Sequence, residues 1–234
     1  MGSQRIALIT GTSRGIGRGL VERFLSDGYR VVGCSRGEAP ALAGDYEHTR
    51  LDIGEEAAVR SWVRGVKHSH DRIDVVVNNA GISARAPALV TAGSTAAEVM
   101  RVNFHGACLV SQEAAKVMVR NRYGRIVNIA SVACGLHSEG ASVYAASKSA
   151  LIEYSKVLAK ELAASDITVN VVAPSAVETA MLEQIDRRAL EVSRQELTIK
   201  RNCTVEEVGH VVSFLASQEA SCVTGQVIYL GLVV

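Results

Sequence analysis

Proline and aromatic residues are scarce in this sequence, and both absences narrow the possibilities. Only three prolines occur in 234 residues, and no Pro-, Ser- or Gly-rich linker divides the chain, so we expect one domain over residues 1–234. Aromatic residues make up 4% of the chain, whereas hydrophobic residues make up 48%. The predicted core is therefore large and aliphatic, built from Val, Ile, Leu and Ala.

Charge bias and long apolar runs are absent as well. The formal net charge is +1, which argues against a nucleic-acid partner, because such binding usually needs a basic patch. The run Ile6–Ile9 is too short for a secretory signal, and no run approaches the roughly 20 apolar residues of a membrane span. We therefore expect a cytoplasmic protein with no membrane partner. Arg120, Arg122 and Arg125 are interpreted as a solvated helix face, with a docking patch as the alternative.

Disulfide and metal-binding patterns are also missing. The five cysteines are widely spaced and form no C-x-x-C pair, so we interpret them as reduced thiols that mostly fill the core. The six histidines have no spacing typical of metal ligands except His68 and His70, which fit a polar helix end better. We therefore expect no metal site.

The sequence does contain a regular alternation of short apolar runs and longer helical stretches. The runs are nearly continuous, which indicates strands buried on both faces, as in a parallel sheet covered by helices on each side. This alternation predicts a Rossmann-type α/β fold, doubly wound, with roughly seven parallel strands and ligands at their carboxyl ends. The expected strands are Arg5–Thr10, Arg30–Cys34, His48–Asp52, Ile73–Val77, Arg125–Ile129, Ile167–Val172 and Gln226–Leu230. The expected helices are Gly15–Asp27, Glu55–Val66, Ser94–Asn121, Ser142–Ala164 and Val205–Ala216.

A glycine-rich segment directly follows the first predicted strand. Gly11, Gly15 and Gly17 have the spacing G-x-x-x-G-x-G between this strand and the next helix. Such glycines allow a tight turn, a close approach of the backbone to a pyrophosphate and close helix packing, with the helix N-terminus facing the phosphates. The position favours nucleotide binding over a plain structural turn, which is the alternative.

The end of the second predicted strand bears on the choice of cofactor. NAD-binding folds usually have an acidic residue there for the ribose 2′-hydroxyl, whereas this sequence has Ser35 and Arg36, and Arg14 lies inside the glycine loop. Two guanidinium groups suit a 2′-phosphate, which arginine binds through charge-assisted hydrogen bonds. The pattern favours NADPH over NADH, and the alternative is two unrelated surface arginines.

A tyrosine and a lysine lie four residues apart at the start of a predicted helix. Tyr144 and Lys148 therefore share one helix face, and a neighbouring ammonium would lower the pKa of the phenol and let it exchange protons near neutral pH. Ser131 follows the strand Arg125–Ile129, at the sheet edge where a ligand should lie, and its hydroxyl could bind a substrate carbonyl. The alternatives are a surface i, i+4 pair and an ordinary turn serine.

These residues together resemble one family, the short-chain dehydrogenase/reductases, over essentially the whole chain. Asn78–Gly81 (NNAG) matches the family motif after the fourth strand, and Asn103, Ser131, Tyr144 and Lys148 match its catalytic tetrad in order and spacing. In this family Asp52 would contact the adenine and Thr179 the nicotinamide carboxamide. The resemblance implies an NADPH site made of Gly11, Ser13, Arg14, Gly15, Ile16, Gly17, Ser35, Arg36, Asp52, Ile53, Asn79, Ala80, Gly81, Tyr144, Lys148, Pro174, Val177 and Thr179.

The resemblance also implies a reaction. Hydride passes from NADPH to a carbonyl carbon, while Ser131 holds the carbonyl oxygen and Tyr144 supplies the proton. Lys148 would lower the pKa of Tyr144 and bind the nicotinamide ribose. Asn103 would hold a water that feeds protons to Lys148.

Within the family the chain is most similar to bacterial 3-oxoacyl-[acyl-carrier-protein] reductases, through segments such as Ile167–Ala173 and Val223–Tyr229. The implied reaction is reduction of a 3-oxoacyl thioester to the secondary alcohol. Arg122 would match a basic residue that docks the acyl carrier protein. The helices Ser94–Asn121 and Ser142–Ala164 would pack against a second copy, in a tetramer or a dimer.

Some positions depart from that pattern. Ser175 replaces the usual glycine after Pro174, Ser165-Asp166 lacks a second docking arginine, and the chain end reads Leu230–Val234 where relatives often have an Asp- or Asn-Gly-Gly. These departures make a specialised reaction, such as polyketide-type or other secondary-metabolite ketoreduction, more plausible. A reductase or dehydrogenase of a small free ketone also fits the motifs. A more remote interpretation is a nucleotide-binding regulatory protein without turnover.

The segment Ser175–Asn202 is expected to form a lid over the substrate, because loops of this kind carry specificity. Four apolar residues in it would either line an acyl site or pack within the lid: Met181, Leu182, Ile185 and Leu190.

Overall fold

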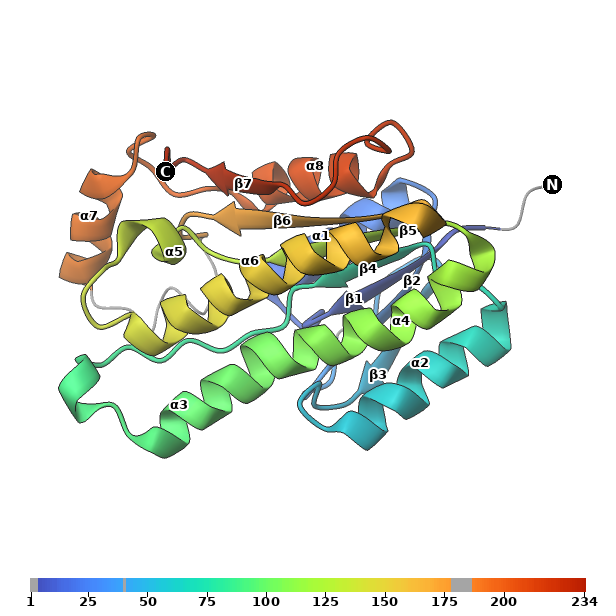
Figure 1. Ribbon diagram of the computed structural model, residues 1–234, viewed down its shortest axis with the longest axis horizontal. Coiled ribbons are helices and arrows are strands. Elements are labelled where there is room, and N and C mark those ends of the chain that lie inside the picture. The colour runs from blue at the N-terminus through green and yellow to red at the C-terminus, as the bar shows by residue number, and fades with distance from the viewer. Residues whose placement is uncertain (1–3, 40, 178–186) are drawn as a thin grey trace.

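A seven-stranded sheet forms the centre of the computed structural model (Figure 1), which describes residues 4–39, 41–177 and 187–234. The strand order is β3-β2-β1-β4-β5-β6-β7, and all six pairings are parallel. The strands are β1 (Ile6–Thr10), β2 (Arg30–Ser35), β3 (Tyr46–Arg50), β4 (Val75–Asn78), β5 (Gly124–Ile129), β6 (Ile167–Pro174) and β7 (Val227–Leu230).

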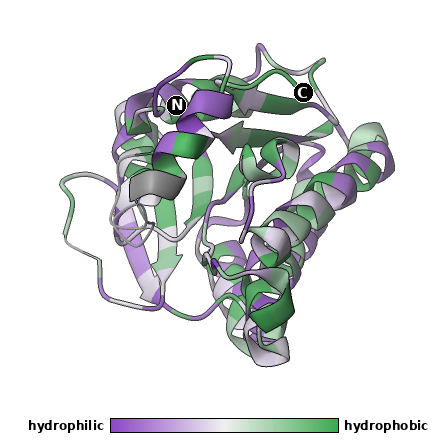
Figure 2. Ribbon diagram, turned by 90° about the vertical axis from the view of Figure 1, so that its left-hand side faces the viewer, coloured by the Kyte–Doolittle hydropathy of each residue, from purple (hydrophilic) through white to green (hydrophobic). Residues whose placement is uncertain are grey.

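Helices cover both faces of the sheet, and each face has its own apolar core. The core on one side contains residues of α2, α4 and α6, and the core on the other side contains residues of α1 and α8. Figure 2 shows the mostly hydrophobic strands between these helices. The architecture confirms the predicted doubly wound α/β fold. The helices are α1 (Gly15–Ser26), α2 (Glu56–His70), α3 (Gly93–Met100), α4 (Ala107–Asn121), α5 (Ala133–Leu136), α6 (Ser142–Leu162), α7 (Arg187–Glu196) and α8 (Val205–Ala216).

Burial differs between the central and the edge strands. All residues of β1, β4, β5 and β6 are buried, and β2 is buried after its first residue. The edge strands β3 and β7 contain no buried residue. The prediction of full burial on both faces therefore holds for the five central strands and is wrong at the edges, where one side of the strand has no neighbour.

Arg125 corrects another expectation, because it does not belong to a solvated helix face. It is 1% exposed within β5. Its guanidinium donates to the carbonyl oxygens of Asp166 at 3.0 Å and Ser217 at 3.2 Å, and it lies 4.4 Å from the ring centroid of Tyr123. Carbonyl acceptors and a ring face are what a buried charge of this kind requires.

The order of the strands reverses beside β1. The chain adds β2 and β3 on one side of β1, and β4 to β7 on the other. In open α/β sheets the ligand lies at such a reversal, beyond the carboxyl ends of the strands. The loops that follow β1 and β4 meet at this place, so the fold positions the glycine loop beside the NNAG segment.

Several elements differ from the sequence-based prediction. The long helix expected over Ser94–Asn121 consists of α3, a π-helical segment Arg101–Gly106 and α4. The short helices α5 and α7 were not expected. The strand β3 spans Tyr46–Arg50 and ends before Asp52, because its pairing with β2 ends at Ser35 and Arg50.

Within the described ranges, no helix is long and apolar enough to cross a membrane. The same part of the chain holds no group of three or more His, Cys, Asp or Glu side chains that could bind a metal ion.

Candidate active site

The loop between β1 and α1 packs tightly against the segment after β4. Gly11 has a φ of +76°, and a Cβ there would lie 2.9 Å from the Cα of Ala80. A Cβ on Gly17 would lie 2.1 Å from the carbonyl oxygen of Gly11. The Nδ2 of Asn79 donates to the carbonyl oxygen of Thr10 at 2.9 Å and joins the two segments. This crowding explains why both positions are glycine.

The N-terminus of α1 has no capping side chain. Arg14 occupies the N-cap position without a side-chain hydrogen bond to the helix, and the first turn contains no acidic residue. The first N–H groups of a helix lack intrahelical acceptors, and the helix dipole makes this end positive. The glycine cradle and this free helix end therefore fit the pyrophosphate of a dinucleotide cofactor.

The carboxyl end of β2 carries the residues expected to select the cofactor. Ser35 donates from Oγ to the carbonyl oxygen of Gly37 at 2.8 Å, and its Oγ lies 2.9 Å from the Nε2 of His48. Because the hydroxyl proton is used on Gly37, the Nε2 of His48 is the donor in this pair. Arg36 is exposed and lines the same cavity as Arg14. The end of β2 is therefore a polar, positively charged platform.

A hydrogen bond from β3 supports the glycine loop across β2. The Oη of Tyr46 donates to the Oγ1 of Thr12 at 2.9 Å. This pair passes over Gly33, where a Cβ would lie 2.6 Å from Oγ1 of Thr12 and 2.9 Å from the ring of Tyr46. Tyr46, in the edge strand β3, therefore helps to position the glycine loop.

Asp52 is held in place by two neighbours. Its carboxylate accepts from Arg101 at 2.8 Å and from the backbone N–H of Gly54 at 2.8 Å. Burial raises the pKa of Asp52, but the hydrogen bonds from Arg101 and Gly54 outweigh it, so the pKa is lower than usual. Asp52 is therefore ionised at neutral pH and lines the cavity in a fixed orientation.

Tyr144 and Lys148 lie one turn apart on α6, and Ser131 follows β5. Burial raises the pKa of Tyr144, whereas a hydrogen bond with Ser131 and the positive charge of Arg85 lower it. Burial outweighs both, so the pKa of Tyr144 is raised above its ordinary value. Lys148 is 3% exposed and donates to the carbonyl oxygen of Ile129 at 2.7 Å. The lowering of the pKa of Tyr144 by Lys148 stays a prediction from the sequence, and Arg85 is an additional cation that acts in the same direction.

Burial also lowers the pKa of Lys148. Removal from water disfavours the ammonium form, and the pKa of Lys148 falls from 10.5 to about 8. A proton can therefore leave this group near neutral pH more easily than it leaves an ordinary lysine.

Asn103 lies in the π-helical segment and holds the backbone of Ile82, directly after the NNAG segment. Its Oδ1 accepts from the backbone N–H of Ile82 at 2.8 Å, and its Nδ2 donates to the carbonyl oxygen of Ile82 at 2.9 Å and to the Oγ of Ser147 at 3.0 Å. A Cβ on Gly81 would lie 3.2 Å from Oδ1 of Asn103 and 3.4 Å from Nζ of Lys148. Asn103 and Lys148 thus face the same glycine.

One cavity of about 640 Å³ brings most of the predicted residues together. Asn103 is outside its lining, and Thr179, Met181, Leu182 and Ile185 lie outside the described residues, whereas Leu190 lines the cavity. Arg122 lies beyond the opposite end of β5, where it donates to the carbonyl oxygen of Ala164 at 3.3 Å. The predicted residues that line the cavity are Gly11, Ser13, Arg14, Gly15, Ile16, Gly17, Ser35, Arg36, Asp52, Ile53, Asn79, Ala80, Gly81, Ser131, Tyr144, Lys148, Pro174 and Val177.

Reasoning from sequence missed several residues of this site. Tyr46 contacts Thr12 of the glycine loop, His48 contacts Ser35, Arg101 holds Asp52, and Arg85 lies near Tyr144. None belongs to a motif, and each meets its partner through strand register or loop packing. The only signal in the sequence was the position of Arg85, a few residues after the NNAG segment.

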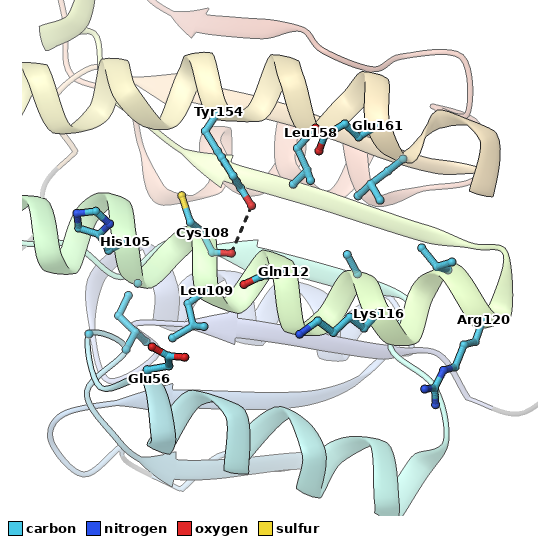
Figure 3. A pocket seen from close by; sticks show the side chains of 16 residues that line it. Glu56, His105, Cys108, Leu109, Gln112, Lys116, Arg120, Tyr154, Leu158 and Glu161 are labelled. Carbon is cyan, nitrogen blue, oxygen red and sulfur yellow. Dashed lines mark hydrogen bonds between the residues drawn. The ribbon is translucent and has the colours of Figure 1, made fainter.

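A second cavity, of about 910 Å³, lies on the outer face of the helical layer. Figure 3 shows it between α4 and α6, with Tyr154 donating to the carbonyl oxygen of Cys108 at 3.4 Å. Apolar residues such as Leu109 and Leu158 share its lining with Lys116 and Glu161. It is separate from the cavity that holds Tyr144.

The fold and the first cavity define a class of protein. A parallel sheet with a glycine loop at its reversal, and a tyrosine and a lysine in the same cavity, is typical of oxidoreductases that use a nicotinamide dinucleotide.

Comparisons with known proteins narrow this class. A family model described as enoyl-(acyl carrier protein) reductase matches residues 11–231. The 3-oxoacyl-[acyl-carrier-protein] reductase FabG of Thermotoga maritima is 36% identical, over 98% of this chain and 98% of that protein. FabG of Aquifex aeolicus is 34% identical, over 97% and 95% of the two chains, and MabA of Mycobacterium tuberculosis is 36% identical, over 96% and 90%.

Solved structures agree with the sequence relatives. A levodione reductase superposes with a TM-score of 0.92 at 28% identity, over 99% of this chain and 97% of the other. The aldohexose dehydrogenase of Thermoplasma acidophilum superposes with a TM-score of 0.90 at 29% identity, over 98% and 94%. The chain belongs to the short-chain dehydrogenase/reductase family and is an oxidoreductase of the ketoreductase type. The prediction of family and reaction class is confirmed.

Proposed function

We propose that the protein reduces a ketone to a secondary alcohol with NADPH, and that its substrate is a 3-oxoacyl thioester linked to acyl carrier protein or CoA. The observation that carries the proposal is the meeting of Ser131, Tyr144 and Lys148 with the glycine loop in one cavity. The curated relatives that cover nearly the whole chain, and whose names state this reaction, support the choice of substrate.

The residues of the cavity divide the work of the reaction. NADPH, when bound, supplies the hydride that the carbonyl carbon accepts. The hydroxyl of Ser131 holds the carbonyl oxygen, and Tyr144 gives its phenolic proton to that oxygen as it becomes an alcohol. The buried ammonium of Lys148, with a pKa of about 8, returns a proton to the phenolate. Asn103 fixes the backbone of Ile82, next to Gly81, which lies beside Lys148.

The preference for NADPH rests on the positive platform at the end of β2. Arg14 and Arg36 line the cavity together with Ser35, and their guanidinium groups suit a 2′-phosphate. Changing Arg36 to Leu should raise the KM for NADPH about tenfold or more, as expected for a charge-assisted hydrogen bond, and leave that for NADH unchanged. Arg30→Leu, at the other end of β2, is the matched control. Equal loss with both cofactors would contradict the assignment.

A free ketone is the second candidate substrate. The structural neighbours act, by their names, on levodione and aldohexose, and the described part of the lid contributes only Leu190 and Ser193 to the cavity beyond the segment 175–177. The lid segment 175–202 is proposed to choose between a thioester and a free ketone.

We also propose that two copies associate through the groove of Figure 3, within a dimer or tetramer. Lys116 on α4 and Glu161 on α6 line it together with apolar residues, so two grooves related by a twofold axis would be complementary to each other. Val119 lines the groove and is 41% exposed. Val119→Glu should lower the mass measured by light scattering to that of one chain without loss of helix content; an unchanged mass would contradict the proposal.

Arg122 is proposed as a contact for an acyl carrier protein, and the cytoplasm as the site of action. The five free cysteines suit a reducing compartment. Docking is measurable as weaker binding of acyl carrier protein to an Arg122→Ala variant.

The first experiment on function follows NADPH oxidation with 3-oxobutanoyl-N-acetylcysteamine, with NADH run in parallel. Tyr144→Phe should lower kcat by about 100-fold or more, the usual contribution of a general acid. Tyr154→Phe, on the same helix but outside the cavity, should keep its activity. No turnover of the thioester by the wild type, with reduction of a free ketone, would move the substrate to the second candidate.

A further inference from the structure

An arginine at the substrate end of the cavity has no role in the reaction described above. Arg85 lies in the loop after β4, lines the cavity, and is close enough to Tyr144 to lower its pKa. Within the described residues it makes no salt bridge or hydrogen bond. Arg85 is an exposed residue, so its guanidinium is open to a ligand that enters the cavity, and no described carboxylate pairs with it.

Hydrogen bonds hold the backbone next to Arg85 in place. The next residue, Ala86, donates its N–H to the carbonyl oxygen of Gly140 at 3.0 Å. The carbonyl oxygen of Ala86 accepts from the hydroxyl of Thr91 at 3.4 Å. Gly140 has a φ of +74° and lies in the turn that leads into α6. The loop that carries Arg85 is therefore tied to the turn that precedes Tyr144.

The charges along the cavity are unevenly distributed. Its acidic lining residues within the described ranges are Glu38 and Asp52, both at the adenosine end. Asp52 is already paired with Arg101 at 2.8 Å. The substrate end carries the cations of Arg85 and Lys148 and no described carboxylate.

Hydroxyl groups accompany Arg85 in this part of the cavity. Ser83, Ser138 and Ser193 line it together with Leu136 and Leu190. A cavity that binds only a hydrocarbon chain needs neither a guanidinium nor a set of hydroxyl donors in its lining. Guanidinium and hydroxyl groups together are the donors that bind carboxylate and phosphate oxygens in proteins.

We propose that Arg85 forms an anion subsite, which binds a carboxylate or phosphate group of the substrate and thereby places the carbonyl between Ser131 and Tyr144. This inference rests on the proposed ketone reduction and adds the chemical class of the substrate. The anion has two possible sources. It is either a carboxylate on the ketone-bearing chain or the phosphate of the pantetheine arm that carries a thioester.

The experiment compares two pairs of ketones that differ in charge. The first pair is 4-oxopentanoate and its methyl ester, which places the anion on the ketone-bearing chain. The second pair is 3-oxobutanoyl-4′-phosphopantetheine and 3-oxobutanoyl-pantetheine, which places it on the arm. Values of kcat and KM are measured with NADPH for the wild type, Arg85→Met, Arg85→Lys and the control Arg64→Met, an exposed arginine on α2. Calorimetric titration of the same four compounds onto enzyme with NADP+ gives affinities that do not depend on turnover.

The wild type should prefer the charged member of one pair by about tenfold or more, mainly in KM. Arg85→Met should remove that preference and change kcat/KM of the uncharged member by less than about twofold. Arg85→Lys should keep part of the preference, and Arg64→Met all of it. The pair that shows the preference identifies the source of the anion.

Two results would overturn the subsite. One is the absence of a charge preference in both pairs, by kinetics and by calorimetry. The other is an equal loss for charged and uncharged members in Arg85→Met, which would indicate a structural role. Turnover of the uncharged ketones by the wild type would leave the proposed reduction standing in either case. Charge-selective binding without turnover would instead support the subsite and count against the proposed reaction.

Discussion

The buried ammonium of Lys148 should lower the stability of the protein at neutral pH. Its pKa is about 8 in the folded chain against 10.5 for an ordinary lysine. At about 1.4 kcal/mol per pH unit, this difference corresponds to a cost of about 3 kcal/mol for keeping the group charged in the folded state. Lys148→Met removes that cost, but it also removes the hydrogen bond to the carbonyl of Ile129, which contributes about 1.5–3 kcal/mol. At pH 7 the two effects nearly cancel or leave the variant slightly more stable.

The pH dependence separates these two effects. Between pH 8 and 10.5 the unfolded chain binds a proton at Lys148 that the folded chain has lost, so the stability of the wild type rises with pH relative to the variant. Below pH 8 both states are protonated and the full cost is present. The free energy of unfolding of the wild type minus that of Lys148→Met should therefore increase by about 3 kcal/mol from pH 7 to 10.5.

Urea unfolding at pH 7, 8, 9 and 10.5 measures this difference. Lys156→Met is the matched control, because Lys156 lies on the same helix but is exposed and paired with Glu153. Its difference from the wild type should stay nearly constant over this pH range. A flat curve for Lys148→Met, or the same slope for both variants, would refute the argument from burial.

Three further substitutions test a hydrogen bond to the glycine loop, a glycine that follows this loop, and a helix cap. Tyr46→Phe removes the hydrogen bond to Thr12. We expect the KM for NADPH to rise several-fold with little change in kcat, and the free energy of unfolding to fall by about 1 kcal/mol. An unchanged KM would contradict this expectation. Gly17→Ala forces a Cβ to within 2.1 Å of the carbonyl of Gly11, so fluorescence titration should show cofactor affinity at least tenfold weaker, and retained affinity would show that the loop adapts. Thr204→Ala removes the capping box of α8 and should lower stability by about 1 kcal/mol without changing kcat; a loss of activity would mean that this cap also serves the site.

Local signals in the sequence predicted some elements closely. The helix α8 begins and ends at Val205 and Ala216, as expected from its apolar periodicity, and Thr204 caps it. Tyr144, Lys148 and Ser131 meet in one cavity because each follows a neighbouring strand or opens the next helix. Such placements follow from topology, which alternating strands and helices determine.

Features that depend on tertiary contacts were not predictable in this way. The limits of β3 follow from its register with β2, and the half-buried edge strands follow from having a neighbour on one side only. The orientation of Asp52 depends on Arg101, 49 residues away. The proximity of Arg85 to Tyr144 depends on how its loop binds the turn before α6. None of these pairings leaves a periodic trace in the sequence.

The π-helical segment between α3 and α4 has a consequence for how this region tolerates length changes. A π turn holds one residue more than an α turn, and each residue of an α-helix advances it by about 100° around its axis. Deleting one residue between Arg101 and Gly106 would let α3 and α4 merge into one regular helix. The deletion would also rotate one half against the other, and Asn103 would then turn away from Ile82. A related protein that is one residue shorter between Arg101 and Gly106 should therefore lack the contact between Asn103 and the backbone of Ile82.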